Sequence, residues 1–222
     1  MTIHGLIFDL DGTLVDSFQA IHASLQSAMG SLGMTPWDYA TTVRNVGRGL
    51  GHLIEAAVGR DRKAEALERF RADYAATCLT RTSLLPGVAE TLPRLKASGR
   101  RLAVATNKSL PFTLQILGHF GIHSHFDCVL APEEVARPKP HPDMIRAVLR
   151  RLDLPARHCL YVGDMPLDVE TATRAGVGCM LVATGFYPFE ELARTVSVPV
   201  VRRFSQVADA LDPQAQGPCG PP

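Results

Sequence analysis

Short apolar runs alternate with amphipathic stretches along most of this chain. The runs lie at 5–10, 100–106, 126–131, 158–164 and 178–184, and Gly, Pro or polar residues bound them. Runs of this kind are typical of strands that are buried on both faces of a parallel sheet. The stretches between the later runs predict helices, at 87–98, 110–120, 141–153 and 167–175. This alternation predicts an α/β fold built on a doubly wound parallel sheet.

Residues 17–84 interrupt the alternation. They contain no convincing strand and predict four helices, near 17–32, 37–45, 50–58 and 61–79. A helical insertion directly after the first strand is expected to form a cap, whose two connections permit closure over the sheet edge. The predicted division is a core of residues 1–15 and 85–212, a helical cap of residues 16–84, and a disordered Pro- and Gly-rich tail of residues 213–222.

Composition narrows the function classes. The chain has 222 residues, of which 46% are hydrophobic, and a formal net charge of +1, so no charge excess points to nucleic acid or an anionic membrane. No apolar run approaches the ~20 residues that a membrane helix needs, and we expect no signal peptide. Five cysteines without a C-x-x-C pair indicate reduced thiols and a cytoplasmic protein. We expect a monomer or a homodimer.

Two aspartates stand where the first strand ends, in the segment "FDLDGTLVDS". Ligands of open parallel sheets bind outside the carboxyl ends of the strands, so Asp9 and Asp11 are expected at the mouth of the sheet rather than in its core. Gly12 lets the backbone turn sharply there, and the pair can offer oxygen ligands to a hard cation. Taken alone, a D-x-D-G segment is better explained by an Asx turn that caps a strand.

Three further polar clusters follow other predicted strands. Thr106 and Asn107 in "AVATN" offer a hydroxyl and an amide for phosphate oxygens, close to the free N–H groups of the next helix. Lys139 lies between two prolines in "RPKPHPD", and the stiff, extended backbone that they impose is expected to hold this lysine in a defined position. Asp164 and Asp168 in "LYVGDMPLD" are one helical turn apart and can face the same point. Each cluster alone would predict only a helix-capping or surface residue. Four polar clusters at the same edge of the sheet together predict a ligand-binding site.

This ordered set resembles the haloacid dehalogenase superfamily over residues 5–184. The motifs that carry the resemblance are D-x-D-G-T-L-x-D-S and G-D-x-x-x-D. The resemblance implies a Rossmann-like core, a Mg²⁺ cofactor and an aspartyl-phosphate intermediate. In that chemistry Asp9 would attack phosphorus, and Asp11 would protonate the leaving oxygen and then activate water.

The resemblance also implies roles for the other strand-end residues. Thr106 and Asn107 would bind the phosphoryl group, with Gly12 beside the substrate, and Lys139 would neutralise both the phosphoryl group and Asp9. Mg²⁺ would be held by Asp9, Asp164 and the backbone carbonyl of Asp11, and Asp168 would support this metal shell. A phosphate dianion repels a carboxylate nucleophile, so a metal ion and a lysine are needed nearby to cancel charge.

Asp11 favours phosphate ester chemistry within the superfamily. Dehalogenases and phosphonate hydrolases resemble this pattern but generally lack the second aspartate, because they protonate no alkoxide. A phosphoacceptor receiver domain, the non-enzymatic alternative, would have no reason to carry a helical cap. The predicted substrate is therefore a small phosphorylated metabolite.

A segment of the predicted cap provides the sequence evidence on which metabolite is the substrate. The segment "NVGRGLGHLI" resembles the V-G-N-G segment of phosphoglycolate phosphatases, with Arg48 in place of the usual asparagine. Arg48 is expected either to bind an anionic group such as the glycolate carboxylate or to lie exposed on a Gly-rich loop. The leading prediction is 2-phosphoglycolate. A sugar phosphomutase similar to β-phosphoglucomutase, or a phosphatase for pyrophosphate, a nucleotide or a sugar phosphate, stays open.

Overall fold

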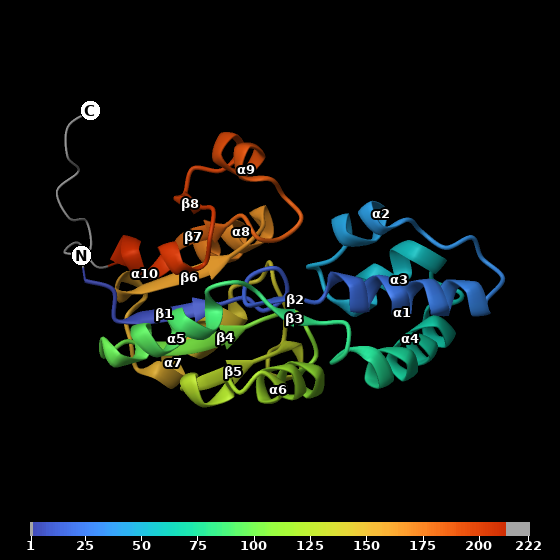
Figure 1. The fold of residues 1–222 in the computed structure, drawn as a ribbon, viewed down its shortest axis with the longest axis horizontal. Helices are drawn as coiled ribbons and strands as arrows, with labels where there is room; N and C mark the ends of the chain where they lie inside the picture. Colours follow the sequence, from blue (N-terminus) through green and yellow to red (C-terminus); the bar gives the residue numbers. More distant parts are fainter. Residues whose placement is uncertain (1, 212–222) are drawn as a thin grey trace.

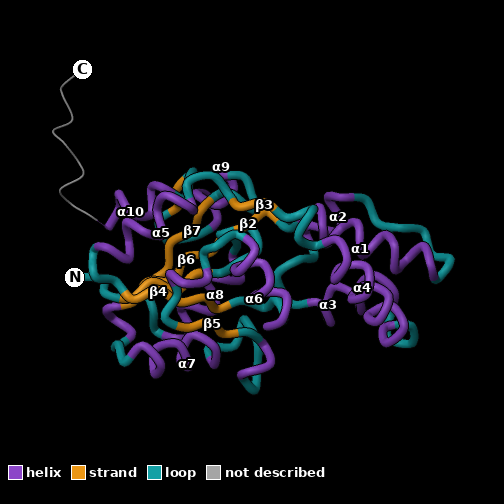
Figure 2. Tube along the Cα trace, turned by 60° about the horizontal axis from the view of Figure 1, so that its bottom comes forward, coloured by secondary structure: helices purple, strands orange, loops and turns teal. Residues whose placement is uncertain are grey.

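A six-stranded parallel sheet forms the centre of the core (Figures 1 and 2). The computed structural model describes residues 2–211, so the predicted disordered tail of residues 213–222 lies outside it. The strand order is β5-β4-β1-β6-β7-β8. The strands of this sheet are β1 (Gly5–Phe8), β4 (Arg101–Ala105), β5 (Cys128–Leu130), β6 (Cys159–Gly163), β7 (Gly178–Val182) and β8 (Val200–Val201).

Helices cover both faces of the sheet. They are α5 (Val88–Ala97), α6 (Leu110–His119), α7 (Asp143–Leu152), α8 (Pro166–Ala175), α9 (Phe189–Thr195) and α10 (Ser205–Leu211). Leu6 and Phe8 of β1 join the hydrophobic cluster on the side of α5, α6 and α10, whereas Ile7 joins the cluster on the side of α7 and α8. Both faces of β1 are therefore buried, which explains its continuous apolar run.

The α/β fold predicted from the apolar runs is confirmed. Five of the six strands lie within the predicted runs, and α5 to α8 agree with the predicted helices to within one or two residues. The pattern missed β8, α9 and α10. A two-residue strand such as β8 is too short to show any period, so sequence periodicity could not reveal it.

The inserted segment forms a helical cap with a hydrophobic core of its own. It contains α1 (Phe18–Ser31), α2 (Tyr39–Arg44), α3 (Leu50–Val58) and α4 (Lys63–Thr77). Ile54, Phe70 and Tyr74 are among the buried residues of that core. In Figure 1 the cap lies beyond the end of the sheet at which β1 leads into the connection to α1.

A short antiparallel ribbon joins the cap to the core. It consists of β2 (Val15–Asp16) and β3 (Ser83–Leu84), which the sequence pattern did not predict. The Asp16 carboxylate accepts a hydrogen bond of 3.1 Å from the backbone N–H of Phe18, the first residue of α1, as in an Asx turn. Both connections of the cap therefore pass through one paired hinge.

No helix within residues 2–211 combines the length and the apolar character needed to cross a membrane.

Candidate active site

Three neighbouring strands end at the same edge of the sheet, each in a buried polar residue. Asp9 follows β1, Thr106 follows β4 and Asp164 follows β6, and the order β4-β1-β6 makes these strands adjacent. The exposed fractions of the three residues are 4%, 1% and 0%. Sheet topology alone therefore brings together residues that lie about a hundred and fifty positions apart along the chain.

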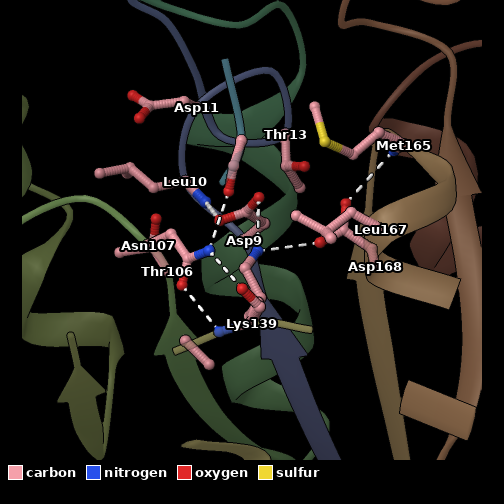
Figure 3. A network of polar contacts seen from close by, with 12 residues as sticks. Asp9, Leu10, Asp11, Thr13, Thr106, Asn107, Lys139, Met165, Leu167 and Asp168 are labelled. Carbon is pink, nitrogen blue, oxygen red and sulfur yellow. Dashed lines mark hydrogen bonds and ion pairs between the residues drawn. The ribbon is translucent and has the colours of Figure 1, made fainter. Parts of the chain in front are cut away.

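The ammonium group of Lys139 lies between Asp9 and Asp168, as Figure 3 shows. Its ammonium nitrogen is 2.8 Å from Asp9 Oδ2 and 2.9 Å from Asp168 Oδ1, and it donates a 3.0 Å bond to the Tyr161 hydroxyl. The Tyr161 hydroxyl in turn donates to the backbone carbonyl of Ala105. A lysine has three N–H donors, and all three of Lys139 have an acceptor here. Its buried charge is therefore held in one position.

Asp9 carries a costly negative charge in this setting. Burial raises the pKa of Asp9 to about 6, Lys139 opposes that rise, and Asp168 adds to it. Its Oδ1 accepts a 2.8 Å bond from the backbone N–H of Leu10, while Oδ2 faces Lys139. Lys139 thus offsets only part of the cost of burying the Asp9 charge, so a further positive charge nearby would stabilise the ionised carboxylate.

Asp164 has an oxygen without a protein partner. Its Oδ2 atom is buried and accepts no hydrogen bond from residues 2–211, whereas Oδ1 lies 3.4 Å from the Thr13 hydroxyl. Burial, together with the nearby Asp168 and Asp9 charges, raises the pKa of Asp164 well above its ordinary value. A Cβ atom at Gly12 or at Gly185 would overlap this carboxylate. The two glycines therefore leave a cradle around an acidic oxygen that nothing in the described chain satisfies.

Asp168 orients the residues around it. Its Oδ1 receives Lys139, and its Oδ2 accepts the backbone N–H groups of Asp164 and Met165, at 3.1 and 3.2 Å. The second bond belongs to the start of α8, where an acidic residue is favoured by the free N–H groups of the first turn. Asp168 thus links the position of Lys139 to that of Asp164.

These acidic residues fit a hard divalent cation. Asp9, Asp164 and Asp168 each offer a carboxylate oxygen, and these atoms lie within 4.8 Å of one another. Within residues 2–211, no other group of three or more His, Cys, Asp or Glu side chains is placed so that it could hold a metal ion. Oxygen ligands at this spacing suit Mg²⁺, and the buried, unpartnered Asp164 Oδ2 fits a role as one of these ligands.

Thr106 and Asn107 behave differently from each other. The Thr106 hydroxyl accepts a bond from the backbone N–H of Lys108, and no hydrogen bond within residues 2–211 uses its O–H as donor. The Asn107 side chain is fully engaged, since it donates to the carbonyls of Gly47 and Lys139 and accepts from the Lys139 N–H. Asn107 therefore ties the cap loop to the Lys139 loop, and its predicted contact with a phosphoryl group stays a prediction.

The Asp11 carboxylate points away from the acidic cluster (Figure 3). It forms an ion pair with Lys108, whose ammonium lies 3.0 and 3.2 Å from its two oxygens, and it accepts a bond from the Ser17 hydroxyl. Burial by itself lowers the pKa of Lys108, but Asp11 and Tyr74 outweigh burial and raise it. Lys108 was not among the site residues predicted from the sequence, although it follows Asn107 directly and lies just beyond the same strand end.

Gly12 has a structural reason to be glycine. Its φ of +81° lies in the left-handed region, and its N–H donates to the carbonyl of Val15. The Gly12 carbonyl accepts the Thr184 hydroxyl at 2.7 Å. Its predicted place beside the substrate stays a prediction, because the contacts of its backbone are within the protein.

A pocket between the cap and the core opens onto Asp9 and Asp11. Its wall from the core includes Thr106, Asn107 and Lys108. The cap contributes an apolar lining and one tyrosine: Ile21, Leu50, Leu53, Phe70 and Tyr74.

Arg48 lines a different pocket, next to Pro166, Glu170 and Tyr187. Its neighbours Gly47 and Gly49 do line the pocket above Asp9. In this structure Arg48 does not line the pocket above Asp9, and its expected contact with substrate stays a prediction.

The sequence pattern of the haloacid dehalogenase-like hydrolases matches residues 6–182. The chain belongs to this family. The match spans β1 to β7 and thus every strand-end residue described above. The family membership confirms the resemblance inferred from the D-x-D-G and G-D-x-x-x-D motifs.

Proteins named phosphoglycolate phosphatase are similar in sequence to most of this chain. A protein of Yersinia pestis named phosphoglycolate phosphatase is 32% identical over 216 residues, covering 94% of this chain and 93% of that protein. A phosphoglycolate phosphatase of Cereibacter sphaeroides is 37% identical over 189 residues, covering 82% and 86%. The crystal structure of a predicted phosphoglycolate phosphatase from Haemophilus somnus superposes with a TM-score of 0.87 at 26% identity, covering 96% and 99%.

Proposed function

We propose that this hydrolase is a Mg²⁺-dependent phosphatase that cleaves 2-phosphoglycolate through an aspartyl-phosphate on Asp9. The observation that carries the proposal is the buried Asp9 carboxylate, held by Lys139 beside an acidic cluster at the floor of the pocket under the cap. The names of the relatives from Yersinia pestis and Cereibacter sphaeroides support the substrate. A small phosphorylated metabolite in the cytoplasm is accordingly the proposed partner, with no nucleic acid or membrane.

The first chemical step transfers the phosphoryl group to the protein. An oxygen of Asp9 attacks phosphorus, the bond from phosphorus to the ester oxygen breaks, and the Asp11 carboxyl group gives its proton to that oxygen. The Thr106 hydroxyl has a free hydrogen to donate to a phosphoryl oxygen, and Lys139 balances the charge of Asp9. In this scheme glycolate leaves with the proton of Asp11.

The second step regenerates the enzyme. The Asp11 carboxylate removes a proton from a water molecule, whose oxygen attacks the phosphorus of the aspartyl-phosphate and releases inorganic phosphate and Asp9. Mg²⁺, when bound by Asp9, Asp164 and the Asp11 carbonyl, would neutralise charge on the phosphoryl group. Asp168 would keep Lys139 and the backbone of Asp164 in place.

The pocket lining is consistent with a small leaving group. Ile21, Leu50, Leu53 and Phe70 of the cap face the space above Asp11. A hexose would place several hydroxyl groups against these apolar side chains without hydrogen-bond partners, and each such loss is unfavourable. Glycolate has one carbon between its ester oxygen and its carboxylate, and so it exposes few polar groups to this lining.

A substrate panel tests the proposal. We expect the protein to release phosphate from 2-phosphoglycolate with a kcat/KM at least about tenfold above that for hexose phosphates, and chelation of Mg²⁺ to remove this activity reversibly. Phosphate release with Mg²⁺, with chelator and with Mg²⁺ restored measures this. Activity that survives chelation would contradict the metal, and a requirement for a bisphosphate activator with little phosphate release would indicate a phosphomutase instead.

Gly185→Ala tests the cradle around Asp164. The added methyl group would overlap the Asp164 carboxylate, so we expect the Mg²⁺ concentration for half-maximal activity to rise by about tenfold or more. Gly118→Ala in α6 is the matched control, because a Cβ there meets nothing within 4 Å. Titration of phosphate release with Mg²⁺ measures both variants. An unchanged Mg²⁺ requirement in Gly185→Ala would remove Asp164 from the proposed metal site.

A further inference from the structure

Lys108 is a buried cation that the proposed chemistry does not use. Its side chain is 7% exposed, and among the described residues it is the only Lys, Arg or His that lines the pocket above Asp9 and Asp11. It differs from Lys139, whose three donors are all accepted by protein oxygens. Within residues 2–211 the short hydrogen bonds of Lys108, at 3.0 and 3.2 Å, run to the Asp11 carboxylate, and the Tyr74 hydroxyl also lies near its ammonium. Lys108 therefore retains donor capacity toward the pocket.

Tyr74 provides a second polar group at the same place. Its exposed fraction is 2%, it lines the pocket, and its hydroxyl has no hydrogen-bond partner within residues 2–211. The Lys108 ammonium lies 4.8 Å from the centre of the Tyr74 ring. Lys108 interacts with this hydroxyl but can only donate to it, so the buried Tyr74 O–H has no acceptor within residues 2–211. A buried donor without an acceptor is unfavourable, and its presence on a pocket wall points to a ligand that supplies one.

The position of Tyr74 is well defined by its neighbours. Its ring stacks on Phe70 of the cap at 5.4 Å and meets the edge of Phe112 of the core at 4.9 Å. Phe70 belongs to α4 and Phe112 to α6, so Tyr74 lies where the cap and the core meet. Burial raises the pKa of Tyr74, so its hydroxyl keeps the proton that it can donate.

We propose that Lys108 Nζ and the Tyr74 hydroxyl together bind the carboxylate of the substrate's leaving group, which makes them the residues that select a phosphorylated acid over a neutral phosphate ester. This inference rests on the proposed function and deepens it. The cap residues around Tyr74 are apolar, and Lys108 is the one cation among the described residues of the lining, so these two donors are the ones best suited to a carboxylate.

The chemistry places the carboxylate within reach of this pair. The ester oxygen must lie within hydrogen-bond distance of the Asp11 carboxyl group that protonates it. Lys108 contacts that same carboxyl group at 3.0 Å. In phosphoglycolate only a methylene and the carboxyl carbon separate the ester oxygen from the carboxylate oxygens. A substrate that is aligned on Asp11 therefore brings its carboxylate next to Lys108, whereas Arg48 lines the neighbouring pocket.

The test compares phosphoglycolate with ethyl phosphate, in which a methyl group replaces the carboxylate. The quantity measured is the ratio of kcat/KM for the two esters, because it cancels any general effect on Asp11. We expect Lys108→Met to lower this ratio by about 10- to 100-fold, as for loss of a charged hydrogen bond, and Tyr74→Phe to lower it by about two- to tenfold. Tyr74→Phe keeps the ring and removes only the hydroxyl.

Matched controls separate this role from others. Lys63→Met and Tyr39→Phe change a lysine and a tyrosine of the cap outside the pocket and should keep the wild-type ratio. Equal losses of kcat/KM for both esters in Lys108→Met would overturn the inference and indicate a contact that only holds the cap. A ratio that falls in Arg48→Ala but not in Lys108→Met would overturn it as well. A wild-type protein that does not prefer phosphoglycolate to ethyl phosphate would overturn the proposed substrate, and this inference with it.

Discussion

Asp9→Asn is expected to reduce phosphate release by at least about four orders of magnitude, as is typical for loss of a catalytic nucleophile. The amide has nearly the same shape as the carboxylate, but it cannot attack phosphorus. The fold should persist, because burial already disfavours the charge of Asp9 and Lys139 keeps Asp168 as its partner. The measurement is phosphate release from phosphoglycolate in the presence of Mg²⁺.

Trapping of the intermediate makes the Asp9 prediction specific. Acid quenching followed by intact-protein mass spectrometry should detect a phosphorylated wild-type protein and no phosphorylated Asp9→Asn protein. Asp11→Asn is the informative comparison, because with a good leaving group it should form the aspartyl-phosphate and hydrolyse it slowly. Phosphorylation of an Asp9→Asn sample whose mass confirms the amide would show that another residue is the nucleophile.

Lys139→Met is expected to remove activity and to destabilise the protein strongly. The substitution keeps much of the side-chain volume but leaves Asp9 and Asp168 buried without their shared cation. Loss of one partner of a buried ion pair costs about 3–5 kcal/mol of unfolding free energy, and we expect a loss of this size here. Urea unfolding in the presence of chelator measures it, and turnover should fall by about three orders of magnitude or more.

Two further variants identify the cause of that destabilisation. Lys139→Met combined with Asp168→Asn should recover part of the lost stability, because the double variant buries fewer uncompensated charges. Lys96→Met removes a lysine whose pair with Asp127 is partly exposed, and it should cost about 1 kcal/mol or less. A Lys139→Met protein as stable as wild type would mean that the carboxylates are neutral in the folded protein.

The fold and much of the candidate site could be predicted because both depend on local patterns and one topological rule. The run at 5–10 is apolar on both faces of its strand, and this predicts a parallel sheet. Carboxyl ends of such strands lie at one edge, so Asp9, Thr106 and Asp164 could be placed together without coordinates. Two-residue elements such as β2 and β3 could not be predicted, since they exist only because the two hinge segments meet.

Contacts between the cap and the core could not be read from the chain. Tyr74 occurs in a largely charged and polar helix, and nothing local distinguishes it from a packing residue. Its position near Lys108 results from the closure of α4 against α6, which joins segments more than thirty residues apart. Asn107 is a similar case, because its side chain bonds to Gly47 of the cap as well as to the Lys139 loop.

The sequence by itself determined the α/β alternation, the helical insertion, the strand ends that carry Asp9, Asp11, Thr106 and Asp164, and the proline-flanked loop that carries Lys139. These features follow from periodicity and from the geometry of parallel sheets, which are properties of short segments. The tertiary structure alone decided that Asp168 shares Lys139 with Asp9 and that a second lysine pairs with Asp11. Lys139 is committed to Asp9 and Asp168, whereas Lys108 is paired with Asp11 and faces the pocket. Such pairings depend on distances of a few ångströms between distant segments, and local sequence does not encode them.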